Sequence, residues 1–142
     1  MPISGDWDGN GTTEIGVRRP SAGTFHPRLA DGSSAPVWLG DADDLPVTGD
    51  WDGSGTTDLG VFDQATATFP LRSVTASGLS VLEVVQFGAA GDLPVTGDWN
   101  GDGVTDLGVW SPATATFTQG AGRAPTSARG VLRTIRFGHP RR

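Results

Sequence analysis

Alternating hydrophobic and polar positions divide the chain into short strands separated by turns rich in glycine and proline. The residues from 80 to 87 form the clearest alternating segment, and residues 131–137 match it. Residues 59–62 (Leu-Gly-Val-Phe) and 66–69 (Thr-Ala-Thr-Phe) give two further strands after a turn. β-branched and aromatic residues favour strands, and no segment has the 3.6-residue period of an amphipathic helix. The pattern therefore predicts an all-β protein.

This pattern occurs three times along the chain. Residues 43–69 and 91–117 are identical at 20 of 27 aligned positions, and residues 2–25 form a third, more diverged copy. The aspartates that begin the central turn of each copy are separated by 44 and then 48 residues. A closing signature ends each copy: Trp38-Leu39-Gly40, Gln86-Phe87-Gly88 and Arg136-Phe137-Gly138.

A repeat of this length with four short strands is typical of one β-propeller blade. We therefore expect a single repeat domain over residues 1–142, with four-stranded antiparallel blades at about residues 2–42, 43–90 and 91–140. A β-sandwich is the alternative, but it does not explain near-identical repeats. Propellers usually have about four to eight blades. We expect a homo-oligomer to complete the ring, most simply a head-to-tail dimer, unless the chain is a piece of a longer propeller.

Composition removes several function classes. The net charge is −6, and nine of the sixteen acidic residues lie in the three central turns, so no basic stripe is present for nucleic acid. The absence of cysteine excludes disulfides and thiolate metal sites. No apolar run approaches the roughly 20 residues that span a bilayer. No signal peptide precedes the first repeat, so the chain is either intracellular or a piece of a larger exported protein.

Each copy contains a nine-residue acidic loop, at residues 6–14, 50–58 and 98–106. Oxygen-bearing side chains stand at positions 1, 3, 5 and 9 of the loop, and glycines at positions 4 and 6 permit the positive φ angles of a tight curl. Calcium takes six to eight oxygen ligands, and position 7 would offer a backbone carbonyl. Carboxylates this close repel one another without a cation. Single turns of this kind are common on surfaces, but three in register predict about three calcium ions per chain.

The motif Gly-Asp-Trp-Asp-Gly-x-Gly-x-Thr-Asp-Leu-Gly-Val, with Phe-Gly closing a copy, resembles the FG-GAP/VCBS repeats. Those repeats also build the propeller of integrin α subunits, and the resemblance covers all three copies. It implies a mainly structural calcium ion, bound by a loop that joins two adjacent strands on the outer rim of one face. The ligands it implies are Asp6, Asp8, Asn10, Thr12 and Glu14; Asp50, Asp52, Ser54, Thr56 and Asp58; and Asp98, Asn100, Asp102, Val104 and Asp106.

Two loops depart from the motif. Glu14 has a longer arm than the aspartate of the other copies, and Ser54 is a neutral ligand. We expect the third loop to be among the tighter sites, and we do not expect the first to be the tightest.

The aromatic residues have two interpretations, sugar stacking and core packing. We favour the core, because large aromatic side chains are usually buried. The residues concerned are the loop tryptophans Trp7, Trp51 and Trp99, the strand tryptophans Trp38 and Trp110, and the equivalent Phe25, Phe69 and Phe117.

The function we expect is extracellular or cell-surface binding of a glycan or protein ligand, in the manner of a lectin or adhesin. The alternatives are a purely structural self-assembling propeller unit and an accessory domain of a secreted polysaccharide-active enzyme. We expect no catalysis, since no nucleophile, phosphate-loop or zinc motif is present and the loop acids are committed to metal. Specificity is expected in residues 29–36, 72–79 and 118–130, which differ between copies.

Overall fold

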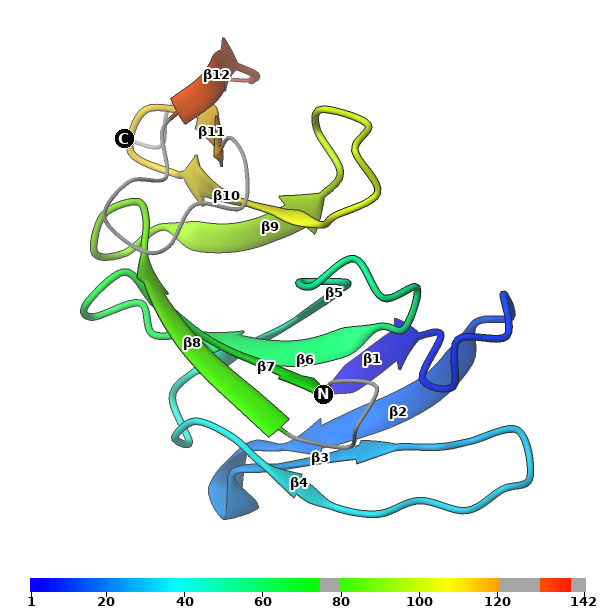
Figure 1. Ribbon diagram of the computed structural model, residues 1–142. Helices are drawn as coiled ribbons and strands as arrows, with labels where there is room; N and C mark the ends of the chain where they lie inside the picture. Colours follow the sequence, from blue (N-terminus) through cyan, green and yellow to red (C-terminus); the bar gives the residue numbers. More distant parts are fainter. Residues whose placement is uncertain (75–79, 121–130, 139–142) are drawn as a thin grey trace.

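The computed structural model describes residues 1–74, 80–120 and 131–138, which form three four-stranded antiparallel sheets (Figure 1). The first sheet contains β1 (Pro2–Gly5), β2 (Glu14–Arg19), β3 (Thr24–Pro27) and β4 (Val37–Trp38). The second contains β5 (Leu45–Gly49), β6 (Asp58–Phe62), β7 (Thr68–Val74) and β8 (Ser80–Gln86). The third contains β9 (Leu93–Gly97), β10 (Asp106–Ser111), β11 (Thr116–Gly120) and β12 (Val131–Arg136).

Within each sheet, strands that are consecutive in the sequence pair with one another, so each sheet is a simple meander. A single turn of 3-10 helix, η1 (Pro20–Ala22), lies between β2 and β3. The predicted all-β class and the four-stranded antiparallel sheets are confirmed. No helix within the described ranges is long and apolar enough to cross a membrane.

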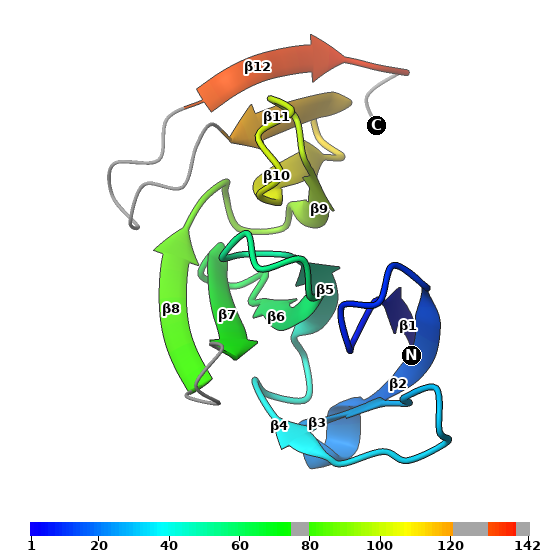
Figure 2. The same cartoon turned by 45° about the vertical axis from the view of Figure 1, so that its right-hand side comes forward.

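The three sheets follow one another through their first strands. β1 contacts β5, and β5 contacts β9, so the first strands lie together while the fourth strands lie toward the outside (Figure 2). The hydroxyl of Thr48 donates to the carbonyl of Ser4 at 3.3 Å, and the hydroxyl of Thr96 donates to the carbonyl of Thr48 at 3.0 Å. The same side chain at the same place in the repeat therefore links each sheet to the one before it.

Two hydrophobic clusters lie at the two junctions between sheets. The smaller joins Phe25 and Leu39 of the first sheet unit to Leu59 and Val61 of the second. In the larger cluster, Leu107 and Val109 of β10 pack against the second sheet. The second-sheet members are Val47, Trp51, Phe62, Ala67, Phe69, Leu71, Val85 and Phe87. Burial of apolar area at both junctions stabilises the order of the sheets.

The closing glycines allow these junctions to form. Gly40 and Gly88 have φ angles of 76° and 91°, in the left-handed region that favours glycine. A Cβ atom on Gly40 would lie 2.7 Å from Val61, and one on Gly88 would lie 2.8 Å from Val109. At these two glycines, the missing side chain leaves room for a valine of the next sheet.

Most of the aromatic residues expected in the core are buried or half-buried. Phe25, Phe69 and Trp51 are buried, and the rings of Phe62 and Phe69 lie 4.5 Å apart. The half-buried aromatic residues are Trp7, Trp99, Trp110 and Phe117. The prediction for Trp38 is wrong, because 66% of its surface is exposed. Its neighbour Leu39 occupies the buried position instead.

Candidate functional site

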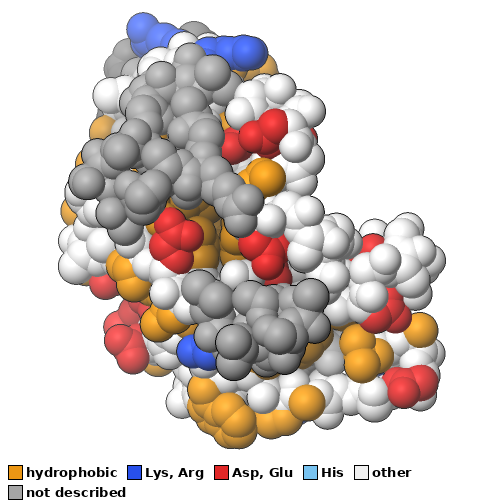
Figure 3. Space-filling view, viewed as in Figure 1, with side chains coloured by type: hydrophobic (Ala, Val, Ile, Leu, Met, Phe, Trp, Pro, Cys, Tyr) orange, Lys and Arg blue, Asp and Glu red, His pale blue; other side chains and the backbone are white. Residues whose placement is uncertain are grey.

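The acidic loops connect the first and second strands of each sheet, between β1 and β2, β5 and β6, and β9 and β10. These three loops lie along one side of the molecule in Figure 1, and Figure 3 shows acidic side chains on that side as well as on the opposite one. The repeat places chemically similar groups at the same end of three successive sheets.

The first aspartate of each loop holds the loop in its curl. Asp6 accepts hydrogen bonds from the backbone N–H groups of Gly9, Asn10 and Gly11, at 2.8, 3.0 and 2.8 Å. In the third loop, Asp98 accepts the same three bonds at 2.8, 3.1 and 2.9 Å. The Gly103 N–H is the main cause of a pKa of Asp98 below its ordinary value, against a smaller opposing effect of desolvation. This carboxylate is therefore ionised at neutral pH.

Positions 3, 5 and 9 continue the same arrangement. In the first loop, Asp8 accepts from the Asn10 N–H at 3.1 Å, and Asn10 accepts from the Thr12 N–H at 2.7 Å. The ninth residue, Glu14, accepts from the Trp7 N–H at 2.9 Å through Oε2. The other loops repeat these bonds through Asp52, Ser54 and Asp58, and through Asn100, Asp102 and Asp106.

The loop glycines have the backbone conformation that the sequence predicts. Gly9 and Gly11 have φ angles of 75° and 87°, and the equivalents in the other loops have φ between 75° and 87°. A residue with a Cβ atom would be strained there. The tight curl is what turns alternate side chains toward one centre.

Three carboxylates converge in each of the first two loops. Asp6, Asp8 and Glu14 offer oxygens within 4.8 Å of one another, and so do Asp50, Asp52 and Asp58. Such a cluster of oxygen donors suits a hard divalent cation such as Ca²⁺. In the first loop, Glu14 Oε1 is buried without a hydrogen-bond partner, which is the state of an oxygen that a cation would satisfy.

The third loop differs in this respect. Among the described residues it has no group of three converging carboxylates, because Asn100 stands at the position of Asp8 and Asp52. Its acids Asp98, Asp102 and Asp106 occupy positions 1, 5 and 9. The backbone carbonyls of Thr12, Thr56 and Val104, and the ranking of the three loops by affinity, stay predictions.

A threonine from the following repeat clamps each of the first two loops. The Thr57 N–H donates to the Asp6 carbonyl at 2.8 Å, and the Asp6 N–H donates to the Thr57 hydroxyl at 2.9 Å. Thr105 makes the same two bonds to Asp50, both at 2.8 Å. Each clamping threonine directly precedes the ninth residue of its own loop, so the loops of neighbouring sheets are coupled.

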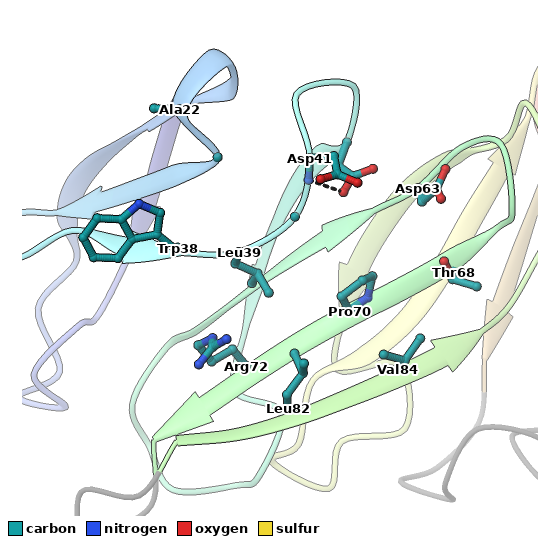
Figure 4. A pocket seen from close by; sticks show the side chains of 13 residues that line it. Ala22, Trp38, Leu39, Asp41, Asp63, Thr68, Pro70, Arg72, Leu82 and Val84 are labelled. Carbon is teal, nitrogen blue, oxygen red and sulfur yellow. Dashed lines mark hydrogen bonds between the residues drawn. The ribbon is translucent and has the colours of Figure 1, made fainter.

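A cleft of about 490 Å³ lies between the first and second sheets, away from the loops. Trp38, at the end of β4, stands on one side of it, and Figure 4 shows the side chains of β7 and β8 on the other. That opposite face is made by two cross-strand pairs, Pro70 with Val84 and Arg72 with Leu82.

Charged groups border this cleft. Asp41 and Asp44 line it, and Asp63 lines it just after the end of β6; Figure 4 shows Asp41 and Asp63. The Thr66 hydroxyl donates to Asp63 at 2.8 Å, and this bond is the main cause of a pKa of Asp63 below its ordinary value. The cleft thus combines an exposed indole with carboxylate and guanidinium groups.

Sequence reasoning did not find this cleft, because it assigned Trp38 to the core on the general tendency of large aromatic side chains to be buried. Aligned on the closing glycine, Trp38 corresponds to Gln86 and Arg136, which are exposed polar residues. Two polar equivalents are the signal that would have identified an exposed tryptophan. Of the segments expected to give specificity, residues 29–36 and 118–120 do not line the cleft, whereas Arg72 of segment 72–79 does. Residues 75–79 and 121–130 lie outside the described residues.

Comparisons with protein-family models, with curated proteins and with solved structures gave no match for this chain.

Proposed function

We propose that the chain is an extracellular, calcium-stabilised binding module that holds a glycan in the cleft between its first two sheets. Its sheets would be propeller blades of the FG-GAP/VCBS type. The observation that carries the proposal is Trp38, whose large apolar ring is 66% exposed at the border of a cleft that also contains Asp63 and Arg72.

Sugars match this combination of groups. A pyranose ring has an apolar face of C–H groups, which packs on an indole, and a rim of hydroxyls, which need charged or polar partners. Ligand sites commonly join aromatic walls to a few placed polar groups. Arg72 would donate to a sugar oxygen, and Asp41 or Asp63 would accept from a hydroxyl, with charge-assisted strength.

Calcium would support this site by ordering the sheets. The acids of loops 6–14 and 50–58 and the position-5 side chains would hold the ion, which would neutralise carboxylates that otherwise repel one another. The clamps from Thr57 and Thr105 tie each loop to the next repeat, so an ordered loop stabilises the junction between sheets. The proposed role is binding without catalysis, because these acids serve as ligands. Calcium sites of extracellular modules work at about 10⁻⁴–10⁻³ M.

A glycan array with the calcium-loaded protein tests the binding site. We expect binding to a defined class of sugars, and loss of that binding in Trp38→Ala, since the stacking surface is removed. Gln86→Ala is the matched control, because Gln86 is the exposed equivalent of Trp38 in the second sheet. An array without any bound sugar, or equal binding by Trp38→Ala and the native chain, would refute the glycan proposal and favour the purely structural alternative.

Calorimetry separates the metal from the sugar. We expect Ca²⁺ to bind more tightly than Mg²⁺ and to raise the melting temperature, and EDTA to reverse the rise. Asp52→Asn removes one carboxylate of the second loop and should weaken a site by about 1–2 kcal/mol. Asp63→Asn, outside the loops, is the control and should leave calcium binding unchanged. A melting temperature that is the same with Ca²⁺ and EDTA would contradict the calcium proposal alone.

A further inference from the structure

The two junctions between sheets have the same design, and it can be described by three contacts. The closing hydrophobic residue of one sheet packs on the second strand of the next: Leu39 lies in one cluster with Val61, and Phe87 lies in one cluster with Val109. A threonine of the later sheet clamps the acidic loop of the earlier sheet. A hydroxyl on the first strand of the later sheet donates to a carbonyl on the first strand of the earlier sheet.

The first sheet carries the groups equivalent to those by which the second and third sheets pack on the sheet before them. Ile15 and Val17 on β2 correspond to Leu59 and Val61, which are buried, yet they are 66% and 43% exposed. A cavity of about 230 Å³ lies over these two residues, with His26 and Arg28 also in its lining. Thr13, the equivalent of the clamping Thr57, is exposed, as is Ser4, the equivalent of Thr48.

The third sheet carries the groups equivalent to those by which the first and second sheets pack on the sheet after them. Phe137 corresponds to Leu39 and Phe87, which are both buried, but it is 71% exposed. Gly138 has a φ of 90°, as the other closing glycines do, and a Cβ atom there would meet nothing within 4 Å. Asp98 has its loop already curled, at the position where Asp6 and Asp50 are clamped.

We propose that a second copy of this chain docks head-to-tail, with the third sheet of each copy on the first sheet of the other. Phe137 of one copy fills the cavity over Ile15 and Val17 of the other. Thr13 clamps Asp98 across the junction, and the Ser4 hydroxyl donates to the Thr96 carbonyl. The interface is heterologous, and two such junctions close a ring of two chains. The proposal does not depend on calcium or on the glycan.

The occupant is a copy of this chain because the two exposed faces complement each other group by group. A partner without this repeat would lack the groups that complement the apolar cavity, the threonine clamp and the first-strand hydroxyl together. Each of these groups has a paired equivalent at both internal junctions. The second copy thus extends an interface that the chain already builds twice.

Sedimentation velocity over a range of concentrations tests the proposal. The native chain should dimerise, and Phe137→Asp should weaken dimerisation at least about tenfold, since a buried Phe is replaced by a charge. Val17→Asp should do the same from the opposite face. Both residues are exposed in the single chain, so circular dichroism should show an unchanged fold. Gln86→Asp, at an exposed residue of the second sheet outside both faces and outside the cleft, is the control.

Mixing the two variants distinguishes head-to-tail docking from symmetric packing. A chain with Val17→Asp keeps Phe137, and a chain with Phe137→Asp keeps Val17, so the mixture forms one intact junction and associates more than either variant alone. A native chain that stays monomeric, or a dimer insensitive to Phe137→Asp, would overturn the proposal. Open-ended polymers of the native chain would overturn the closed two-chain ring.

Discussion

The first and second sheets have the same strand order and the same loop, but they fill one buried position differently. Phe62 in β6 stacks on Phe69, whereas Arg18 stands at the equivalent place in β2. Arg18 is also fully buried, with its guanidinium carbon 5.3 Å from the centre of the Phe25 ring and Nη2 donating to the Asp41 carbonyl at 2.7 Å. The repeat therefore tolerates a cation where its neighbour has an aromatic ring.

Burying Arg18 where the second sheet has Phe62 costs free energy of folding. Nε and Nη1 of Arg18 are buried without hydrogen-bond partners. Desolvation lowers the pKa of Arg18, and Asp44 and Asp41 oppose this effect only in part. A cation over a desolvated ring gains about 2 kcal/mol, while burial of a charge costs several. The first sheet should be the less stable of the two.

Phe62→Ala has the largest expected effect, because it removes the ring that the second sheet uses and the first lacks. We expect a loss of about 3–5 kcal/mol in the free energy of unfolding, measured with urea, from lost burial and the cavity left behind. Leu29→Ala, on an exposed loop, should change stability by no more than about 0.5 kcal/mol. A loss below about 1 kcal/mol for Phe62→Ala would remove the contrast between the sheets.

Arg18→Met has a smaller effect of opposite sign. An apolar side chain of similar length removes the desolvation cost, and the exposed Asp41 can bond to water instead. We expect the free energy of unfolding to stay equal or to rise by up to about 2 kcal/mol. Differential scanning calorimetry of Arg18→Met beside Arg18→Ala separates charge from volume, since Ala also leaves a cavity. A fall of more than about 2 kcal/mol in Arg18→Met would mean that the buried cation is favourable.

The smallest effect concerns the pH dependence of the first loop without calcium. Desolvation raises the pKa of Asp6, but the N–H groups of Gly11, Asn10 and Gly9 outweigh it and bring the pKa below its ordinary value. Because the folded pKa is depressed, this stability is present above the unfolded pKa and is lost as pH falls through the folded one. The free energy of unfolding, measured with urea in EDTA, should fall less steeply between about pH 5 and pH 2 for Asp6→Asn than for the native chain. The same dependence of the unfolding free energy on pH in both proteins would contradict this role of Asp6.

The sequence predicted the features that lie within one repeat. Alternation and turn residues were enough for four strands per sheet, and the loop glycines were enough for the positive φ angles at Gly9 and Gly11. These are local properties, because the residues that determine them are neighbours in the chain.

Features that depend on the neighbouring sheet were not predictable in this way. Ile15 and Leu59 occupy the same strand position with similar side chains, yet one is exposed and the other buried. The difference comes from the sheet that precedes Leu59. Arg18 was not recognised as a core residue for a related reason, since its burial depends on the closing segment around Asp41. Trp38 was placed in the core because large aromatic side chains are usually buried, although polar Gln86 and Arg136 stand at the equivalent positions of the other copies.

The threonine clamps also set an order of local opening along the molecule. Loop 50–58 is held from both sides, by its own Thr57 on Asp6 and by Thr105 on Asp50. Loops 6–14 and 98–106 are each held from one side in the single chain. Amide hydrogen exchange should therefore be slowest in the middle loop, and thermal fraying should begin at the outer two.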